Sequence, residues 1–347
     1  MLYTINNKEI KGDSSQRICG LDLIRVVAIF FVIAGHFLFL NTSYMKTPIQ
    51  GLSMFLQSMM MSIFYVSVPL FMMLTGYLNI NKSPTKKYYR GMVRVLVAYL
   101  VFSIATILFR TYYMCEERSI VQWTLAILNY SAIPYAWYIE MWIGLALLAP
   151  FLNYLWRAIP TMREKILLIA ILFFLTACPN FISSLFPKYF AQACYPLMFY
   201  FMGTFIREYQ PTIKAWVGIA AVILISMVNP IATILLFGSD SVDVALAGGP
   251  GGVFYTWIAV AIFLMLYRRD ISVKPIKRWV THCSMVSLEM YLCCYMFDQL
   301  YYPWFKERFY ESQAQFLPWF LVIVPLVFFS SYLVAAMYNW VAARVRR

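Results

Sequence analysis

Apolar residues along this chain gather into long runs, which charges or clusters of proline and glycine separate. A run of about 20 apolar residues has the length of a helix that crosses roughly 30 Å of hydrocarbon. Reading the runs in this way predicts ten membrane spans, at residues 20–41, 54–80, 91–113, 136–156, 165–182, 191–206, 213–237, 252–268, 284–303 and 316–341. The pattern therefore predicts an all-α integral membrane protein with about ten transmembrane helices.

Composition agrees with this interpretation and excludes a soluble globular class. Hydrophobic residues make up 62% of the chain and charged residues only 12%, with a mean hydropathy of +0.70. The segments between the predicted spans are too short to fold alone. We therefore expect residues 1–347 to form one transmembrane domain with no separate soluble domain.

The net charge of +13 predicts an orientation in the membrane and excludes a nucleic-acid partner. With ten spans and an internal N-terminus, 21 lysines and arginines fall on the inner side and five on the outer side. Positive residues favour the cytoplasmic loops of membrane proteins, and one missing span would invert every later loop. We expect a multi-pass protein of the plasma (inner) membrane with both termini cytoplasmic and the lipid bilayer as its partner.

The first span carries Asp22, Arg25 and His36, although a charge in mid-span costs at least about 2.5–3.5 kcal/mol on insertion scales. The 11 residues from Arg25 to His36 turn a helix to within about 20° of the same direction and raise it roughly 16 Å. Asp22 is three residues before Arg25 and can pair with it. His36 is the histidine inside a predicted span, and an imidazole can take and return a proton near neutral pH. The alternatives are interfacial roles for Asp22 and Arg25 and a core histidine at position 36.

Two later predicted spans also hold acids. Glu140 follows Trp137 and Tyr138 at the start of the fourth span, where it could accept a proton or orient His36, or could be an interfacial residue among belt aromatics. The ninth span carries Glu289 and Asp298, nine residues apart and therefore on opposite faces of a helix. We expect Glu289 to pair with Arg25 and Asp298 to lie nearer the outer side.

The second inner segment, "NKSPTKKYYRGMVRV", concentrates basic residues that include Lys87, Arg90 and Arg94. Arg90 and Arg94 share a helical face and could hold the phosphates of a cytoplasmic ligand. The alternative is a purely topological role beside anionic lipid. The seven cysteines show no metal-ligand spacing and mostly fall in apolar runs, so we expect buried cysteines and no metal.

Four of these stretches together resemble membrane acyltransferase family 3. "GLDLIRVVAIFFVIAGH" resembles the first-helix signature, with a basic residue and a histidine spaced as Arg25 and His36 are. "VPLFMMLTGYL", "KKYYRGMVR" and "YAWYIEMWIGLALLAP" resemble the elements that follow it, in the same order. The later "YLCC" places Cys294 where many members have the histidine of Tyr-Leu-x-His. This resemblance implies a short, membrane-only member of about ten helices.

The resemblance also implies an activity, namely the transfer of an acyl group, often acetyl, from cytoplasmic acyl-CoA to a hydroxyl of a glycan or lipid-linked sugar. Acyl-CoA is then a donor substrate, and no permanently bound cofactor is expected. The expected catalytic residues are His36, Arg25, Glu140 and Asp22; the expected donor-binding residues are Arg90, Arg94 and Lys87; and the expected acceptor-binding residues are Trp137 and Tyr138. The alternative is a secondary transporter or flippase that uses intramembrane Arg, His and Glu as substrate or proton sites.

Overall fold

The computed structural model describes residues 17–39, 42–181, 188–237 and 251–345, and throughout these ranges it contains helices and no β-strand. The α-helices are α1 (Cys19–Phe39), α2 (Gly51–Phe64), α3 (Ser67–Asn79), α4 (Lys86–Tyr112), α5 (Ile120–Leu128), α6 (Trp137–Ala158), α7 (Met162–Phe181), α8 (Lys188–Tyr209), α9 (Ala215–Phe237), α10 (Val253–Leu266), α11 (Lys274–Met285), α12 (Ser287–Phe309), α13 (Gln313–Phe316) and α14 (Phe320–Val345). Two 3₁₀ turns, η1 (Tyr44–Lys46) and η4 (Leu317–Trp319), complete the described elements.

Helices lie at each of the ten predicted spans, so the all-helical class is confirmed. Within the described ranges, six helical segments are long and apolar enough to cross a membrane, namely Cys19–Leu38, Gly51–Asn79, Lys86–Tyr112, Trp137–Ala158, Ala215–Leu235 and Gln313–Arg344. The apolar helix Val253–Leu266 is shorter. The structure is therefore that of a multi-pass membrane protein, and the count of ten spans stays a prediction.

The second predicted span, 54–80, is divided into α2 and α3 by a break at Tyr65 and Val66. Pro69 explains the break, because proline has no N–H to donate to the carbonyl of Tyr65 four residues earlier. The backbone N–H of Val66 instead bonds the carbonyl of Ile63 at 3.4 Å, and regular bonding resumes when Leu70 donates to Val66. The apolar run alone did not reveal this interruption.

Two helices, α5 and α11, lie where the apolar runs predicted connecting loops. α5 begins with a capping box, in which Ser119 and Gln122 each satisfy the backbone N–H of the other. α11 has Pro275 in its first turn, as many helices do. Both helices are shorter than the run of about 20 apolar residues from which the membrane spans were predicted.

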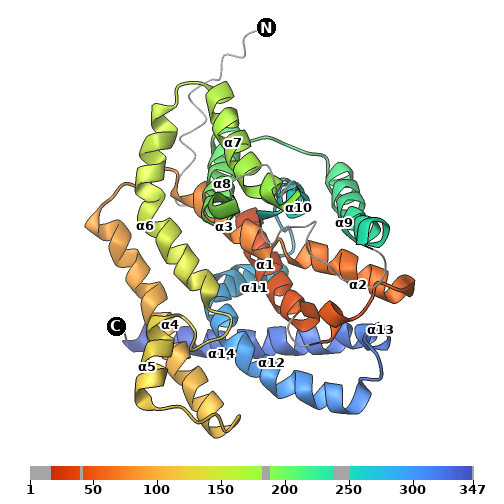
Figure 1. Cartoon of the computed structure of the whole chain (residues 1–347). Coiled ribbons are helices and arrows are strands. Elements are labelled where there is room, and N and C mark those ends of the chain that lie inside the picture. The colour runs from red at the N-terminus through yellow and green to blue at the C-terminus, as the bar shows by residue number, and fades with distance from the viewer. Residues whose placement is uncertain (1–16, 40–41, 182–187, 238–250, 346–347) are drawn as a thin grey trace.

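α1 occupies the middle of the bundle (Figure 1) and contacts α2, α3, α10, α11, α12 and α14. Its buried side chains belong to two separate hydrophobic clusters. Ile29 and Phe37 pack in the cluster built with α2, α12 and α14, whereas Ile24 and Ala28 pack in the cluster built with α3, α8 and α10. α1 therefore joins two halves of the protein.

Glycine allows the closest helix contact in the second half, between α3 and α8. A Cβ atom on Gly76 would overlap the backbone of Tyr200, and a Cβ atom on Gly203 would overlap the backbone of Met73. Small residues let transmembrane backbones approach and gain dispersion contacts that lipid does not offer. These two glycines therefore determine how α3, which forms one wall of the site, packs against the bundle.

Candidate active site

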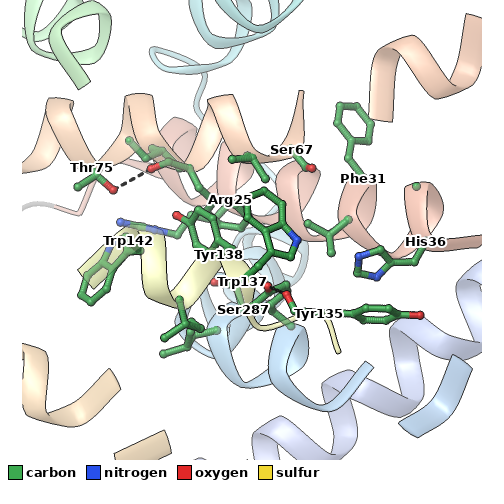
Figure 2. Close-up of a pocket in the computed structure, with 18 of the residues that line it drawn as sticks. Arg25, Phe31, His36, Ser67, Thr75, Tyr135, Trp137, Tyr138, Trp142 and Ser287 are labelled. Atoms are coloured by element: carbon green, nitrogen blue, oxygen red, sulfur yellow. Dashed lines mark hydrogen bonds between the residues drawn. The ribbon is translucent and has the colours of Figure 1, made fainter. Parts of the chain in front are cut away.

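A cavity of about 570 Å³ opens between α1, α3, α4, α6 and α12. Figure 2 shows Arg25 and Trp142 towards one end of it and His36 with Tyr135 towards the other. The predicted residues Trp137 and Tyr138 line the same cavity from the start of α6. The prediction that Arg25 and His36 face the same way along α1 is thus confirmed by their shared cavity.

The imidazole of His36 is held between an aromatic ring and a carboxylate. Its ring centroid lies 3.7 Å from that of Tyr135, with the planes tilted by 35°. Nδ1 of His36 lies 3.9 Å from Oδ2 of Asp298, whose side chain has no exposed surface. Asp298 therefore belongs to the site, whereas the sequence placed it only towards the outer end of its span.

Three residues on one face of α12 lie near His36 or its partner Tyr135. Tyr291, Cys294 and Asp298 are spaced i, i+3 and i+7, which puts them on one stripe of the helix. The hydroxyl of Tyr291 donates to the backbone carbonyl of Tyr135 and so fixes the residue that stacks on His36. Cys294 is fully buried on the same stripe.

Ligand atoms of His36, Cys294 and Asp298 all lie within 4.8 Å of one another. Imidazole nitrogen, thiolate and carboxylate are the ligand types that suit Zn²⁺. Cysteine and histidine spacing along the chain did not show this grouping, because its members come from α1 and α12. The expectation that the protein needs no metal stays a prediction.

Asp22 is buried where α1 meets α11 and accepts hydrogen bonds from several side chains. Arg17 binds it through two nitrogens, at 2.6 and 2.9 Å, and Nη1 of Arg25 lies 3.2 Å away. The hydroxyl of Ser284 donates at 2.8 Å and that of Thr281 at 3.4 Å. With both oxygens occupied in this way, Asp22 is suited to orienting Arg25 and poorly suited to accepting a substrate proton.

A second cavity, of about 930 Å³, lies on the other side of Arg25. Its charged lining comes from three arginines, Arg17, Arg25 and Arg94, and two acids, Asp22 and Glu289. Five residues line both cavities: Arg25, Leu78, Val95, Ser287 and Leu288. The two cavities therefore meet at Arg25.

Glu289 lines the second cavity and pairs with a different arginine from the one expected. Its Oε1 lies 3.6 Å from Nη2 of Arg94, and Arg94 also donates to Oδ1 of Asn339 at 2.9 Å. The expected pair with Arg25 is wrong, since Arg25 turns to Asp22 on its own helix. The prediction that Glu289 and Asp298 lie on opposite faces of their helix is confirmed, because Glu289 faces α4 and Asp298 faces α1.

Four predicted site residues lie outside both cavities, with the buried Asp298 among them. Glu140 is exposed on the first turn of α6 and is not among the residues that line the cavity of His36. Lys87 and Arg90 are exposed on the first turns of α4, whereas Arg94, one turn further on, lines the second cavity. In the described residues, the carboxylate paired with His36 is therefore that of Asp298 and not that of Glu140.

Two residues of the site, Tyr135 and Arg17, do not stand out in the sequence pattern. Tyr135 lies in the turn before α6, and only its stacking on His36 reveals it. Arg17 precedes α1 and was counted with the inner loops, although its guanidinium reaches Asp22. The i, i+3, i+7 spacing of Tyr291, Cys294 and Asp298 was a signal that could have indicated the polar stripe of α12.

The fold and site together define a multi-pass membrane protein with a histidine and an arginine facing a shared internal cavity. The family model described as an acyltransferase domain, acyltransferase family 3, matches residues 19–336, nearly the whole chain. The chain therefore belongs to acyltransferase family 3. Comparison with curated proteins and with solved structures gave no match.

Proposed function

We propose that this protein is a membrane O-acyltransferase, which moves an acyl group, most simply acetyl, from cytoplasmic acyl-CoA to a hydroxyl of a cell-surface or lipid-linked glycan. The observation that carries the proposal is the meeting of two cavities at Arg25, with His36 in the farther one. Family membership supports acyl transfer in general, and it disfavours the transporter alternative.

The second cavity is the proposed entrance for the donor. With ten spans and both termini inside the cell, this cavity lies on the cytoplasmic half of the inner membrane. Arg17 and Arg94 face it and can bind anionic phosphate groups, with exposed Arg90 and Lys87 near its approach on α4. The thioester arm then passes Arg25 into the cavity that His36 lines.

The chemical step uses His36 in one of two ways. As a base, it takes the proton of the sugar hydroxyl while the oxygen attacks the thioester carbonyl; the C–S bond breaks and the CoA thiolate leaves and is protonated. As a nucleophile, it displaces CoA first and then passes the acyl group to the hydroxyl. Arg25, roughly 16 Å along α1 from His36, lies too far away to contact the reacting thioester oxygen, and its proposed role is to bind and guide the donor arm at the junction of the two cavities.

Trp137 and Tyr138 are the proposed acceptor platform. Both line the cavity at the start of α6, and their rings are nearly perpendicular, at 89°. Tyr138 makes an edge contact with Tyr291 and a tilted ring contact with Phe71. Aromatic faces of this kind stack on the apolar faces of sugar rings, with hydroxyls left free to approach His36.

The test compares wild-type protein with His36→Gln in nanodiscs, using radiolabelled acetyl-CoA as the probe. We expect both proteins to bind acetyl-CoA and only the wild type to transfer or slowly hydrolyse the acetyl group. Near-normal turnover in His36→Gln would contradict the role of the imidazole. If no acyl-CoA binds to the wild type, the acyltransferase proposal fails and the two cavities become the path of a transported substrate.

A further inference from the structure

The carboxylate of Asp298 faces the buried side of the His36 imidazole, away from the cavity that this ring lines. Nδ1 of His36 is a buried atom, although the ring itself lines the cavity. Nδ1 is turned to Asp298 at 3.9 Å, and Nε2 is the other ring nitrogen. We propose that Asp298 is the positioning residue of the acyl-transfer reaction, because it holds His36 through Nδ1 and presents Nε2 to the cavity. This inference rests on the proposed function.

Because Asp298 is buried, only the side chains packed around it can stabilise its carboxylate. It is fully buried in the middle of α12, and the ion pair that the described residues give it is the one with His36. An isolated carboxylate at such a site would cost several kcal/mol, so acids inside membrane bundles face a partner. Tyr135 and Tyr302 are the other polar side chains that interact with the same carboxylate.

The surrounding rings restrict the imidazole to the orientation that this role needs. Tyr135 stacks on one face of His36, and Tyr291 fixes the backbone of Tyr135. The 3.9 Å separation from Asp298 exceeds hydrogen-bond length by about 1 Å. Hydrogen bonds between catalytic groups are often long without substrate and tighten in the reacting complex.

The step assigned to Asp298 involves no bond to substrate. When Nε2 takes the hydroxyl proton or the acyl group, the imidazole becomes positively charged, and a carboxylate against Nδ1–H stabilises that charge. Asp298 also selects the tautomer that carries the proton on Nδ1, which leaves the lone pair on Nε2. Its removal should therefore slow turnover while leaving the binding of both substrates unchanged.

The first experiment measures kcat and KM for the slow hydrolysis of radiolabelled acetyl-CoA in nanodiscs by wild type, Asp298→Asn, Asp298→Glu and Leu300→Met. Leu300 is a half-buried residue two positions further along α12, outside both cavities, and controls for disturbance of the helix. We expect kcat to fall about 100-fold in Asp298→Asn, with KM for acetyl-CoA within about twofold. Asp298→Glu should recover part of the loss, because it restores a carboxylate. Leu300→Met should behave as wild type.

A second measurement tests the contact between Asp298 and His36 without requiring acyl transfer. The chain has two histidines, so diethyl pyrocarbonate labelling followed by mass spectrometry reports His36 with His282 as the internal reference. His282 is held by a separate contact, from Nδ1 to the hydroxyl of Tyr332 at 2.8 Å. We expect the labelling rate of His36 relative to His282 to fall about tenfold in Asp298→Asn, because the imidazole loses the partner that holds Nδ1 and presents Nε2 to the cavity.

Either result can overturn the proposal. An unchanged kcat in folded Asp298→Asn, or an unchanged labelling ratio, would show that the carboxylate does not act through His36. Loss of wild-type activity with a chelator and its return with Zn²⁺ would mean that His36, Cys294 and Asp298 bind a metal instead. If the wild type transfers no acyl group at all, the proposed function fails, and the labelling ratio still decides whether Asp298 positions His36.

Discussion

Nη1 of Arg25 lies 3.2 Å from Oδ1 of Asp22, one helical turn earlier on α1. The same carboxylate binds Arg17 and Ser284, so it ties α1 to the chain before it and to α11. Held in this way, Arg25 lines both cavities. Asp22 therefore combines a structural role with the orientation of a residue at the junction of the two cavities.

Removal of the Asp22 charge should destabilise the protein and release Arg25. We expect Asp22→Asn to lower the free energy of unfolding by about 2–3 kcal/mol, less than for a fully buried pair because Arg17 is partly exposed. Denaturant titration in detergent measures the change. Asp270→Asn is the control, since Asp270 pairs with Lys277 at the surface, and it should leave the free energy of unfolding nearly unchanged. Equal losses in both variants would contradict the role of Asp22.

Leu78 lines both cavities from the end of α3 and offers a way to block the passage between them. Its side chain is 43% exposed, so tryptophan can be accommodated there without overpacking a core. We expect Leu78→Trp to reduce acyl transfer at least about tenfold while acetyl-CoA still binds at the arginines. Leu78→Ala should retain transfer. Normal transfer through Leu78→Trp would show that the donor does not pass this point.

The contact between α3 and α8 should be sensitive to a single methyl group. We expect Gly203→Ala to cost about 1–3 kcal/mol, because its Cβ would overlap the backbone of Met73 and force the helices apart. Gly144 on α6 is the matched control, since a Cβ atom there meets nothing within 4 Å. Gly144→Ala should be neutral or stabilise the helix by up to about 1 kcal/mol. Thermal unfolding in one detergent compares the two, and similar losses would contradict the close-contact argument.

Glu116, in the segment between α4 and α5, should make stability depend on pH. Arg110 donates two hydrogen bonds to it, at 2.7 and 2.9 Å, and with Arg118 holds the pKa of the carboxyl below its usual value of 4.5. A depressed pKa contributes stability above pH 4.5, and the contribution is lost as the pH falls through the folded-state pKa. We expect Glu116→Gln to lower Tm at pH 7 and the difference from wild type to shrink below pH 4.5.

Exposed Glu117 provides the control for that comparison. Glu117→Gln should leave Tm within about 1 °C of wild type at every pH, because a surface carboxylate without an ion pair adds little. If the difference in Tm between Glu116→Gln and wild type did not depend on pH, the charge of Glu116 would not contribute to stability.

The positions of the long helices could be predicted from the sequence because hydrocarbon thickness requires a run of apolar residues, and ten such runs are plain to read. The break at Tyr65 and Val66 could have been predicted from Pro69, since the missing N–H is a local property. α5 and α11 could not be found by the same criterion, because they are too short to cross a membrane. The length of an apolar run thus located the long helices, and it could not locate helices too short to cross a membrane.

The cavity that Arg25 and His36 share could be predicted because both lie on one helix, where spacing alone fixes direction. The partners of His36 could not, because Asp298 and Tyr135 come from segments far away in the chain. Glu289 shows the same limit, since its pairing with Arg94 depends on how α4 packs against α12. Helical periodicity gives the face of each residue, and only the packed bundle gives the neighbour.

Because Arg25 and His36 lie on one unbroken helix, α1 fixes the distance between them along its axis. The 11 residues between them span roughly 16 Å along the axis, and no side-chain movement can change that length. A donor anchored at the arginine end must therefore carry its reactive carbonyl on an arm of matching reach. Thioesters of short thiols lack this arm, and acyl chains of different length must be accommodated beyond His36 rather than before it.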